Sequence, residues 1–369
     1  MFNNNDIEYM KLAIELAGKA IGQTTPNPMV GAVIVKDGRI IGEGYHKKAG
    51  ENHAEIEALN SATTDKINGS TMYVSLEPCC HHGKTPPCAE AVIKSGIKEV
   101  IIAAQDPNPL VSGMGIELLK KNGINIKVGL LETEARKLNE FFYMFHENAR
   151  PFIIAKWAMT LDGRTSSDSG DSKWISNDLS RQYVHYVRST VDAVMVAIGT
   201  VIKDDPTLNC RLEGYVGKQP KRIIVDPSCK VPLSFELFLN QPAGEIIIIT
   251  TKMATPERIK NLKDKGCSII QFDQQGGRIK ITDILKKLAE RNIQSIMVEG
   301  GRDLTSSFFS EDLVDKVICF VAPKILGGFK NTSPINNWGM SSMEEVLNLR
   351  DVNIKTFDKD ICIEGYVRK

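Results

Sequence analysis

The chain has 369 residues, which is enough for two or three domains of about 150 residues each. Apolar residues make up 42% and charged residues 25% of the chain, values that are typical of a globular protein and exclude a fibrous or disordered one. The 46 basic and 45 acidic residues leave a net charge of +1, so no global field attracts nucleic acid or an anionic membrane. We therefore expect neither of these as a partner.

No apolar run approaches the roughly 18 residues that suggest a membrane span. The first residues lack the basic start and the apolar stretch of a signal peptide, so the expected compartment is the cytosol. The eight cysteines are then expected to be reduced thiols or metal ligands. Five are scattered singly and fit small core positions. Cys79, Cys80 and Cys88 fall within ten residues and indicate a chemical role.

The first part of the chain alternates helix and strand patterns, which favours a three-layer α/β domain. Asp6 can cap a helix that runs to about Ala20, and Lys36-Asp-Gly38 indicates a hairpin of strands 30–35 and 39–42. Further strands are expected at 72–75, 100–104 and 124–128, and helices at 53–62, 89–95, 114–122 and 133–145.

The segment from Glu147 to Pro151 marks the expected boundary between a domain of residues 1–147 and a second α/β domain of residues 148–369. Strand and helix patterns resume directly after it. In the second domain, strands are expected at 152–157, 193–197, 222–225, 245–250, 295–298 and 317–321, and helices at 179–189, 256–263, 282–291 and 304–309.

A metal constellation is predicted in the first half. His53-Ala-Glu55 stands at the start of a helix, and a segment that contains Cys79 and Cys88 follows the next strand. One imidazole and two thiolates can hold Zn²⁺ tetrahedrally and leave a position for water, whose pKa the metal lowers to about 7. Glu55 can then pass a proton to a leaving amine. This order matches the zinc-deaminase signature, except that eight residues rather than two separate Cys79 from Cys88.

A closed structural zinc site is the alternative. It needs a fourth protein ligand, which Cys80, His81 or His82 could supply. We favour the open site because Pro78-Cys79 and Glu55 both fit the deaminase order. Cys80 is expected to be a neighbour of the metal rather than a ligand.

The second half contains neither a Gly-x-Gly-x-x-Gly nor a Walker A sequence, so any nucleotide must be held in another way. Ser295 to Leu304 has the pattern of a strand, a Gly-Gly turn and a helix start, where backbone amides can bind a phosphate. Segment 156–164 ends a strand, segment 170–176 follows a loop, and segment 199–211 follows another strand. In α/β sheets, such loops gather around ligands at the carboxyl ends of strands.

Together these segments resemble the family of bifunctional deaminase–reductases of riboflavin biosynthesis. The resemblance rests on 25–38, 53–55, 77–88 and 105–109, and it continues through the second half. It implies a cytidine-deaminase-like domain followed by a dihydrofolate-reductase-like α/β domain. It also implies one Zn²⁺ and NADPH as cofactors. The implied reactions are deamination of 2,5-diamino-6-(5-phosphoribosylamino)pyrimidin-4(3H)-one and then reduction of its ribosyl unit to ribityl.

The resemblance also implies site residues. In the first half, His53, Cys79 and Cys88 hold zinc, Glu55 moves protons, and Asn27, His46 and Lys84 match positions near the substrate. The cofactor positions of the second half are Ala158, Trp174, Thr200, Asp204, Gly301, Arg302, Asp303, Leu304 and Thr305. The substrate positions there are Ser172, Arg188, Leu208, Arg211 and Glu299. Pro227 stands where relatives can carry a serine near the cofactor.

Two other functions fit parts of the sequence. A nucleic-acid base deaminase would use the same zinc chemistry, but the balanced charge and the lack of a basic, aromatic tract disfavour it. A binding protein with a structural zinc and a nucleotide-sensing second half is the other alternative. The expected partner is the small phosphoribosyl pyrimidine substrate, and we also expect a homo-oligomer.

Overall fold

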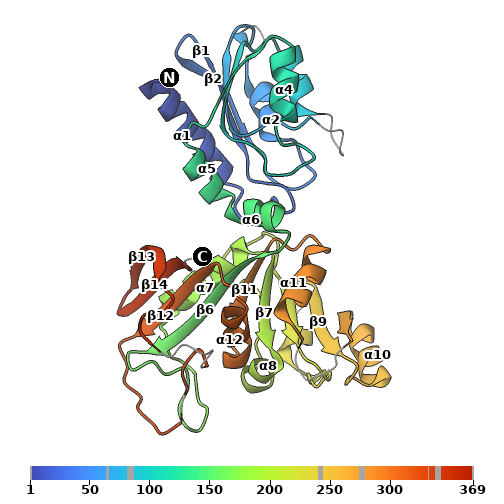
Figure 1. Ribbon diagram of the computed structural model, residues 1–369, viewed down its shortest axis with the longest axis vertical. Helices are drawn as coiled ribbons and strands as arrows, with labels where there is room; N and C mark the ends of the chain where they lie inside the picture. Colours follow the sequence, from blue (N-terminus) through green and yellow to red (C-terminus); the bar gives the residue numbers. More distant parts are fainter. Residues whose placement is uncertain are drawn as a thin grey trace. The chain divides into compact units, whose positions relative to one another are not determined.

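The computed structural model describes residues 2–63, 66–80, 87–239, 244–273, 279–330, 332–336 and 342–367. The chain divides into two compact units, Met1–Ala149 and Arg150–Lys369. This division falls within the 147–151 segment in which the sequence places a boundary. Figure 1 shows one sheet in each unit, with helices packed against it.

The first unit is built around a five-stranded sheet in the order β2-β1-β3-β4-β5. β1 pairs antiparallel with β2 and with β3, whereas β3, β4 and β5 are parallel. The strands are β1 (Gly31–Lys36), β2 (Arg39–Tyr45), β3 (Thr71–Leu76), β4 (Glu99–Ala104) and β5 (Asn125–Val128). The helices are α1 (Asn4–Gly18), α2 (Ala54–Ser61), α3 (Cys88–Lys94), α4 (Met114–Lys121), α5 (Glu132–Leu138) and α6 (Glu140–Asn148).

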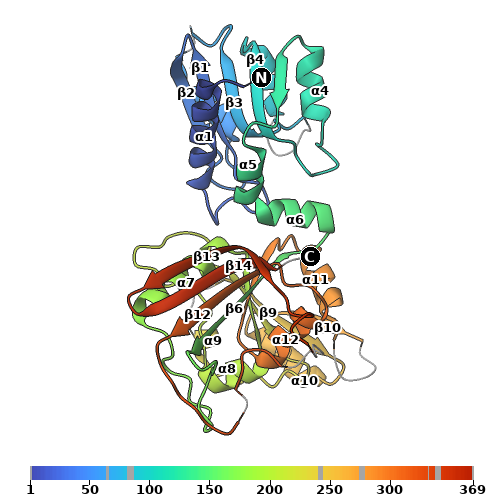
Figure 2. The ribbon, with the colours of Figure 1, turned by 60° about the vertical axis from the view of Figure 1, so that its left-hand side comes forward.

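Both faces of this sheet are covered. Successive strand residues point to opposite faces, so Val33 packs with α1 and α5 whereas Ile34 packs with α2, α3 and α4. In Figure 2, α1 lies along the near face of β1 and β3. The expected three-layer arrangement is therefore present. The cap of α1 differs from the expectation, because Asn3 is the N-cap and Asp6 completes a capping box with it.

The second unit contains a nine-stranded sheet in the order β10-β9-β8-β7-β11-β6-β12-β14-β13. Strands from β10 to β12 are parallel, and β14 and β13 extend the sheet antiparallel. The strands are β6 (Phe152–Thr160), β7 (Ala193–Ala197), β8 (Lys221–Val225), β9 (Ile246–Thr251), β10 (Ser268–Phe272), β11 (Ser295–Glu299), β12 (Lys316–Ala322), β13 (Leu349–Phe357) and β14 (Asp360–Val367). The helices are α7 (Asp178–Thr190), α8 (Ile198–Asp204), α9 (Glu236–Leu239), α10 (Pro256–Asp264), α11 (Ile281–Ala289) and α12 (Arg302–Ser310).

The core of the second unit lies between the sheet and two amphipathic helices. Ile284 and Leu288 of α11 and Phe308 of α12 pack on strand residues such as Met195 and Ile247. Central strands such as β9 are buried along their whole length, as strands covered on both faces usually are. No helix in the described part of the chain is long and apolar enough to cross a membrane.

The structure departs from the expected elements in one divided helix and in several strands and short helices that were not expected. The helix expected at 133–145 is divided at Asn139 into α5 and α6. Asn139 is buried, and its side-chain amide pairs with both the N–H and the C=O of Met29, each at 2.8 Å. This long-range pairing interrupts a helix that the apolar pattern alone would continue. The strands β10, β13 and β14 and the short helices α8 and α9 were not expected from the sequence.

Gly31 lies where the backbone of α1 comes close to β1. A β-carbon at this position would lie 2.0 Å from the backbone oxygen of Ala13, so α1 approaches β1 too closely for any side chain. We expect Gly31→Ala to lower the free energy of unfolding by about 1–3 kcal/mol or more, because the backbone of α1 must move. Urea unfolding of the first unit measures this loss.

Gly18→Ala is the matched control, since the new β-carbon on the same helix would meet only the end of the Leu138 side chain, at 3.9 Å. Alanine also favours a helix over glycine. An unchanged unfolding midpoint in Gly31→Ala would contradict the close approach of α1 to β1.

Candidate functional site

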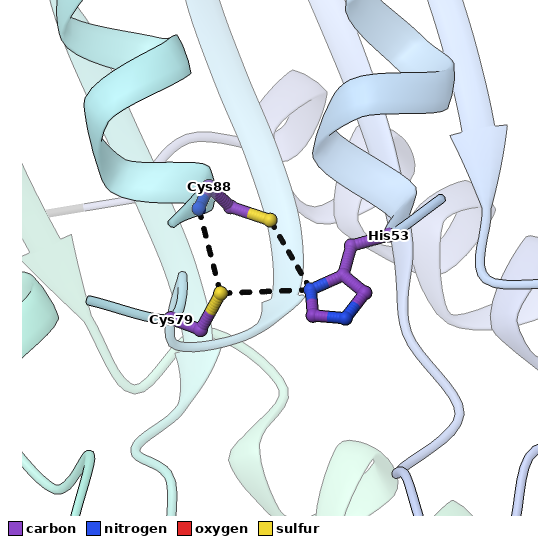
Figure 3. A group of neighbouring side chains, drawn as sticks. All are labelled: His53, Cys79 and Cys88. Carbon is purple, nitrogen blue, oxygen red and sulfur yellow. Dashed lines mark hydrogen bonds between the residues drawn. The ribbon is translucent and has the colours of Figure 1, made fainter. Parts of the chain in front are cut away.

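The three predicted metal ligands converge in the first unit. His53 is the N-cap of α2, Cys79 follows β3, and Cys88 begins α3. His53 Nδ1 lies 3.5 Å from Cys79 Sγ and 3.2 Å from Cys88 Sγ, and the three donor atoms lie within 4.8 Å of one another. Figure 3 shows the side chains pointing towards one another. Ligands on tetrahedral zinc are separated by about 3.5 Å, given Zn–S and Zn–N bonds near 2.3 and 2.0 Å. The donor set therefore fits zinc.

The two thiols have different electrostatic surroundings. Hydrogen bonds from the Cys88 thiol and from His53 lower the pKa of Cys79 to about 4, although burial opposes this shift. The bond to Cys79 and burial raise the pKa of Cys88. The Cys88 N–H also donates to Cys79 Sγ at 3.4 Å. A bound cation would favour the thiolate form of both cysteines.

Glu55 lies in the first turn of α2 and is buried. Burial, together with the negative charge of Cys79, raises the pKa of its carboxyl to about 7. Among the described residues, the group that could hold a metal consists of His53, Cys79 and Cys88 and does not include Glu55. The carboxyl is therefore placed beside the ligands, where it can exchange a proton near neutral pH.

Asn27 and His46 adjoin the same group. The His46 ring lies 5.2 Å from the His53 ring, edge to face. His46 Nδ1 lies 2.9 Å from the Asn52 carbonyl oxygen, which can only accept, so Nδ1 carries the proton. The other ring nitrogen then accepts from the Asn27 side-chain amide at 3.0 Å. Burial lowers the pKa of His46 and so favours this neutral form. His46 thereby orients Asn27.

The structure does not describe all of the remaining residues that were predicted in the first half. Lys84, and the alternative ligands His81 and His82, lie outside the described residues. Cys80 is half-buried and does not belong to the ligand group. Asn139 was missed by the sequence analysis, although it fixes Met29, two residues after Asn27. A polar residue with low helix propensity inside an apolar helical pattern was the available signal.

In the second unit, the predicted cofactor positions cluster where parallel strands end. Ala158 lies near the end of β6, Thr200 and Asp204 belong to α8 directly after β7, and residues 301–305 form the start of α12 after β11. Gly300 and Gly301 have φ of 76° and 84°, which favour glycine. A β-carbon on Gly301 would lie 2.9 Å from that of Ala197. A β-carbon on Gly300 would lie 3.4 Å from Thr200 Oγ1. The glycine turn and the start of α8 are therefore neighbours.

Residues 171–174 approach α8 from another loop. Lys173 donates to the backbone oxygen of Asp204 at 3.1 Å. The Trp174 ring is mostly exposed and is covered on one face by the Arg181 guanidinium, 4.4 Å from its centre. Ser172 belongs to this segment. Predicted positions from three separate segments thus meet at one edge of the sheet.

Glu299 and Arg188 form a buried ion pair at the same edge. Glu299 ends β11, and Arg188 donates to its two carboxylate oxygens at 2.6 and 3.0 Å. Lys156 Nζ, opposite Glu299 in the β6–β11 register, lies 3.9 Å from the carboxylate. Burial raises the pKa of Glu299, but the charges of Arg188 and Lys156 outweigh it and hold the pKa at about 2. Lys156 was not predicted as a site residue, although a cation inside an apolar strand was the available signal.

Arg211 and Leu208 belong to a loop that is tied to α7. The Arg188 guanidinium donates to the Asn209 carbonyl oxygen at 3.0 Å. The Arg211 N–H donates to His185 Nδ1 at 3.2 Å. Leu208 is buried with a φ of 56°, and the Arg211 guanidinium contacts the neutral side-chain oxygens of Thr207 and Asn209. Arg188 is already neutralised by Glu299, so Arg211 is the better candidate for binding an anion.

The ligand geometry predicts which cysteines hold metal. We expect Cys79→Ser and Cys88→Ser to lose bound zinc, because each removes one of three converging donors. Cys80→Ser should keep one zinc per chain and serves as the control. Metal content of the purified variants, measured by atomic emission, tests this. Equal loss of zinc from all three variants would instead indicate a four-ligand structural site.

In comparisons with known proteins, two different family models match two separate parts of the chain. Residues 3–104 match the family model of the cytidine and deoxycytidylate deaminase zinc-binding region. Residues 151–363 match the RibD C-terminal domain. The riboflavin biosynthesis protein RibD of Aquifex aeolicus is 46% identical over 363 residues, which are 98% of this chain and 99% of that protein.

Solved structures show the same similarity. RibD of Acinetobacter baumannii superposes with a TM-score of 0.89 at 37% identity, and the match covers 99% of each chain. A diaminohydroxyphosphoribosylaminopyrimidine deaminase/5-amino-6-(5-phosphoribosylamino)uracil reductase of Thermotoga maritima gives 0.84 at 39% identity, again over 99% of each chain. The expected fold, a deaminase-type domain followed by a reductase-type α/β domain, is confirmed. The chain belongs to the RibD family of bifunctional riboflavin-biosynthesis proteins.

Proposed function

We propose that this chain catalyses two consecutive steps of riboflavin biosynthesis. The first unit deaminates 2,5-diamino-6-(5-phosphoribosylamino)pyrimidin-4(3H)-one. The second unit uses NADPH to reduce the ribosyl unit of the product, giving 5-amino-6-(5-phosphoribitylamino)uracil. The observation that carries the proposal is the convergence of His53, Cys79 and Cys88 beside the buried carboxyl of Glu55. Family membership over nearly the whole chain supports both steps.

In the deamination site, His53, Cys79 and Cys88 would hold one zinc ion. Bound zinc supplies a Lewis acid that activates water for attack on the amine-bearing ring carbon. Glu55 takes a proton at its carboxylate and releases it to the departing amine nitrogen, a role that a pKa near 7 suits. Asn27, oriented by His46, reads the pyrimidine edge through its amide. Lys84 is assigned to the phosphate from the sequence alone.

In the reduction site, NADPH supplies the hydride, and the chain binds and orients both reactants. Ala158, Thr200, Asp204 and residues 301–305 line the cofactor side, together with Trp174. Ser172, Leu208, Arg188, Arg211 and Glu299 line the substrate side. The Arg211 guanidinium can meet the phosphate, because its planar fork matches phosphate oxygens. Arg188 fixes Glu299 and the Asn209 carbonyl, which keeps the loop around Leu208 in place.

Glu55→Gln tests the deamination step. The amide keeps the size of the side chain but cannot accept and release a proton, so ammonia release from the diaminopyrimidine should fall by about 10²-fold or more. Zinc content should stay at one per chain, and NADPH oxidation with the separately deaminated product should be unchanged. Glu90→Gln, in the first turn of α3, is the control and should retain full activity. Loss of zinc in Glu55→Gln would make this residue a ligand and refute its role.

Arg211→Ala tests the substrate side of the reduction step. Loss of one charged contact is worth about 1.5–3 kcal/mol, so reduction should fall by about 10- to 100-fold, mainly through KM. Ammonia release and the dissociation constant of NADPH should change little. Arg291→Ala, which removes a partly exposed contact to Glu245, is the control. A collapse of NADPH affinity in Arg211→Ala would assign this residue to the cofactor instead.

A further inference from the structure

The buried carboxylate of Glu77 accepts an unusual number of backbone hydrogen bonds. Glu77 lies directly after β3, two residues before the proposed ligand Cys79. One carboxylate oxygen accepts from the N–H groups of Gly115 and Ile116, at 2.9 and 3.2 Å. The other accepts from Asp106 and Gly113, at 3.3 and 2.9 Å. Each oxygen therefore serves two donors, and neither the proposed chemistry nor the ligand set accounts for this arrangement.

These four donors come from two places in the fold. Gly113, Gly115 and Ile116 belong to the N-terminus of α4, where backbone N–H groups lack partners within the helix and favour a negative charge. Asp106 lies in the loop that follows β4. A single carboxylate thus joins the end of β3, the end of β4 and the start of α4.

A steric contact strengthens the same junction. A β-carbon on Gly115 would lie 2.0 Å from the carbonyl oxygen of Pro78. The first turn of α4 therefore touches the peptide that links Pro78 to Cys79. Glu77 draws this turn inwards through its hydrogen bonds, and the absence of a side chain at Gly115 allows the approach.

On its other side, Cys79 is held by α3. The Cys79 carbonyl oxygen accepts from the Ala89 N–H at 3.1 Å, and its sulfur accepts from the Cys88 N–H at 3.4 Å. These contacts join two ligands to each other and to α3, which packs in the core of the unit through Ala89 and Val92. The junction at Glu77 is a second attachment of Cys79, independent of α3, to the end of β4 and the start of α4.

We propose that Glu77 is a positioning residue of the metal centre, which sets the place of Cys79 through the backbone of Pro78. The inference rests on the proposed ligand set. A metal site gains affinity when its ligands are ordered before the metal binds, and loss of an outer contact typically weakens metal binding by about 10- to 100-fold. Four backbone N–H groups hold the Glu77 carboxylate in place. These groups need a hydrogen-bond acceptor, so a side chain that presents a donor cannot take the place of Glu77.

Glu77→Gln tests the proposal, because it replaces one acceptor oxygen by an NH₂ group that faces backbone donors. We expect the dissociation constant of Zn²⁺, measured by chelator competition on the folded full chain, to rise by about tenfold or more. The absorption bands of bound Co²⁺, used as a probe of thiolate geometry, should shift. NADPH oxidation with the deaminated product should be unchanged, since the second unit is untouched.

Asp6→Asn is the matched control. Asp6 is also a buried carboxylate of the first unit, and it accepts from the Asn3 N–H and the Tyr73 hydroxyl without contact to the ligands. Both variants should unfold at lower urea concentration, but only Glu77→Gln should weaken zinc binding and shift the Co²⁺ bands. Equal weakening in both variants would show a general loss of stability and overturn the proposal, as would unchanged zinc affinity in Glu77→Gln.

If Glu77→Gln leaves the first unit unfolded, Glu77→Asp takes its place, because it keeps the charge and withdraws it by one methylene group. The same rise in the zinc dissociation constant is expected, and zinc affinity equal to that of the unaltered chain would overturn the proposal. Cys79→Ser separates this test from the proposed function. Retention of zinc in Cys79→Ser would refute the ligand set itself, whatever Glu77→Gln does.

Discussion

A common direction of the strands that lead into each site is the constraint on which both candidate sites depend. β2 and β3 both pair antiparallel with β1 and so run in the same direction, and the helix starts that follow them, with His53 and Cys88, meet at one edge of the first sheet. In the second sheet, β6, β7 and β11 also run in one direction, because β11 pairs in parallel with the other two. Residues distant in sequence, such as His53 and Cys88 or Lys156 and Glu299, are brought within a few ångströms by this single feature.

The same edges carry buried charges, and each unit stabilises them by a different device. In the second unit, Glu299 is neutralised by two cations, Arg188 and Lys156, and removal of both would leave a costly unpaired carboxylate. In the first unit, Glu77 is stabilised by backbone N–H groups and needs no cation. Backbone donors are fixed by the fold, whereas side-chain cations can reorganise when a charged ligand enters.

The sequence alone predicted the features that depend on short spacing. His53-x-Glu55 and the closely spaced cysteines are local patterns, and most central strands appear as continuous apolar runs. Local patterns could not reveal the break at Asn139, because its partner Met29 is 110 residues away. The hairpin of β13 and β14 was not predicted, and β13 is largely exposed in the structure, including its apolar residues Val352 and Ile354. Residues of the reduction site come from many segments, so only the family resemblance suggested that they belong to one site. Lys156 was not among the residues that the resemblance suggested.

The pairing of Asn139 with Met29 has a consequence for cutting the chain into fragments. The zinc-binding family model ends at residue 104, yet Phe142 and Tyr143 of α6 contribute to the core beneath α1, and the Tyr143 hydroxyl donates to the Gln105 carbonyl oxygen. A fragment that stops at the end of the family model would expose this core and remove the hydrogen-bond partner of the Met29 N–H and C=O. The smallest excisable deaminase module therefore extends through α6, well beyond the segment that carries its metal ligands.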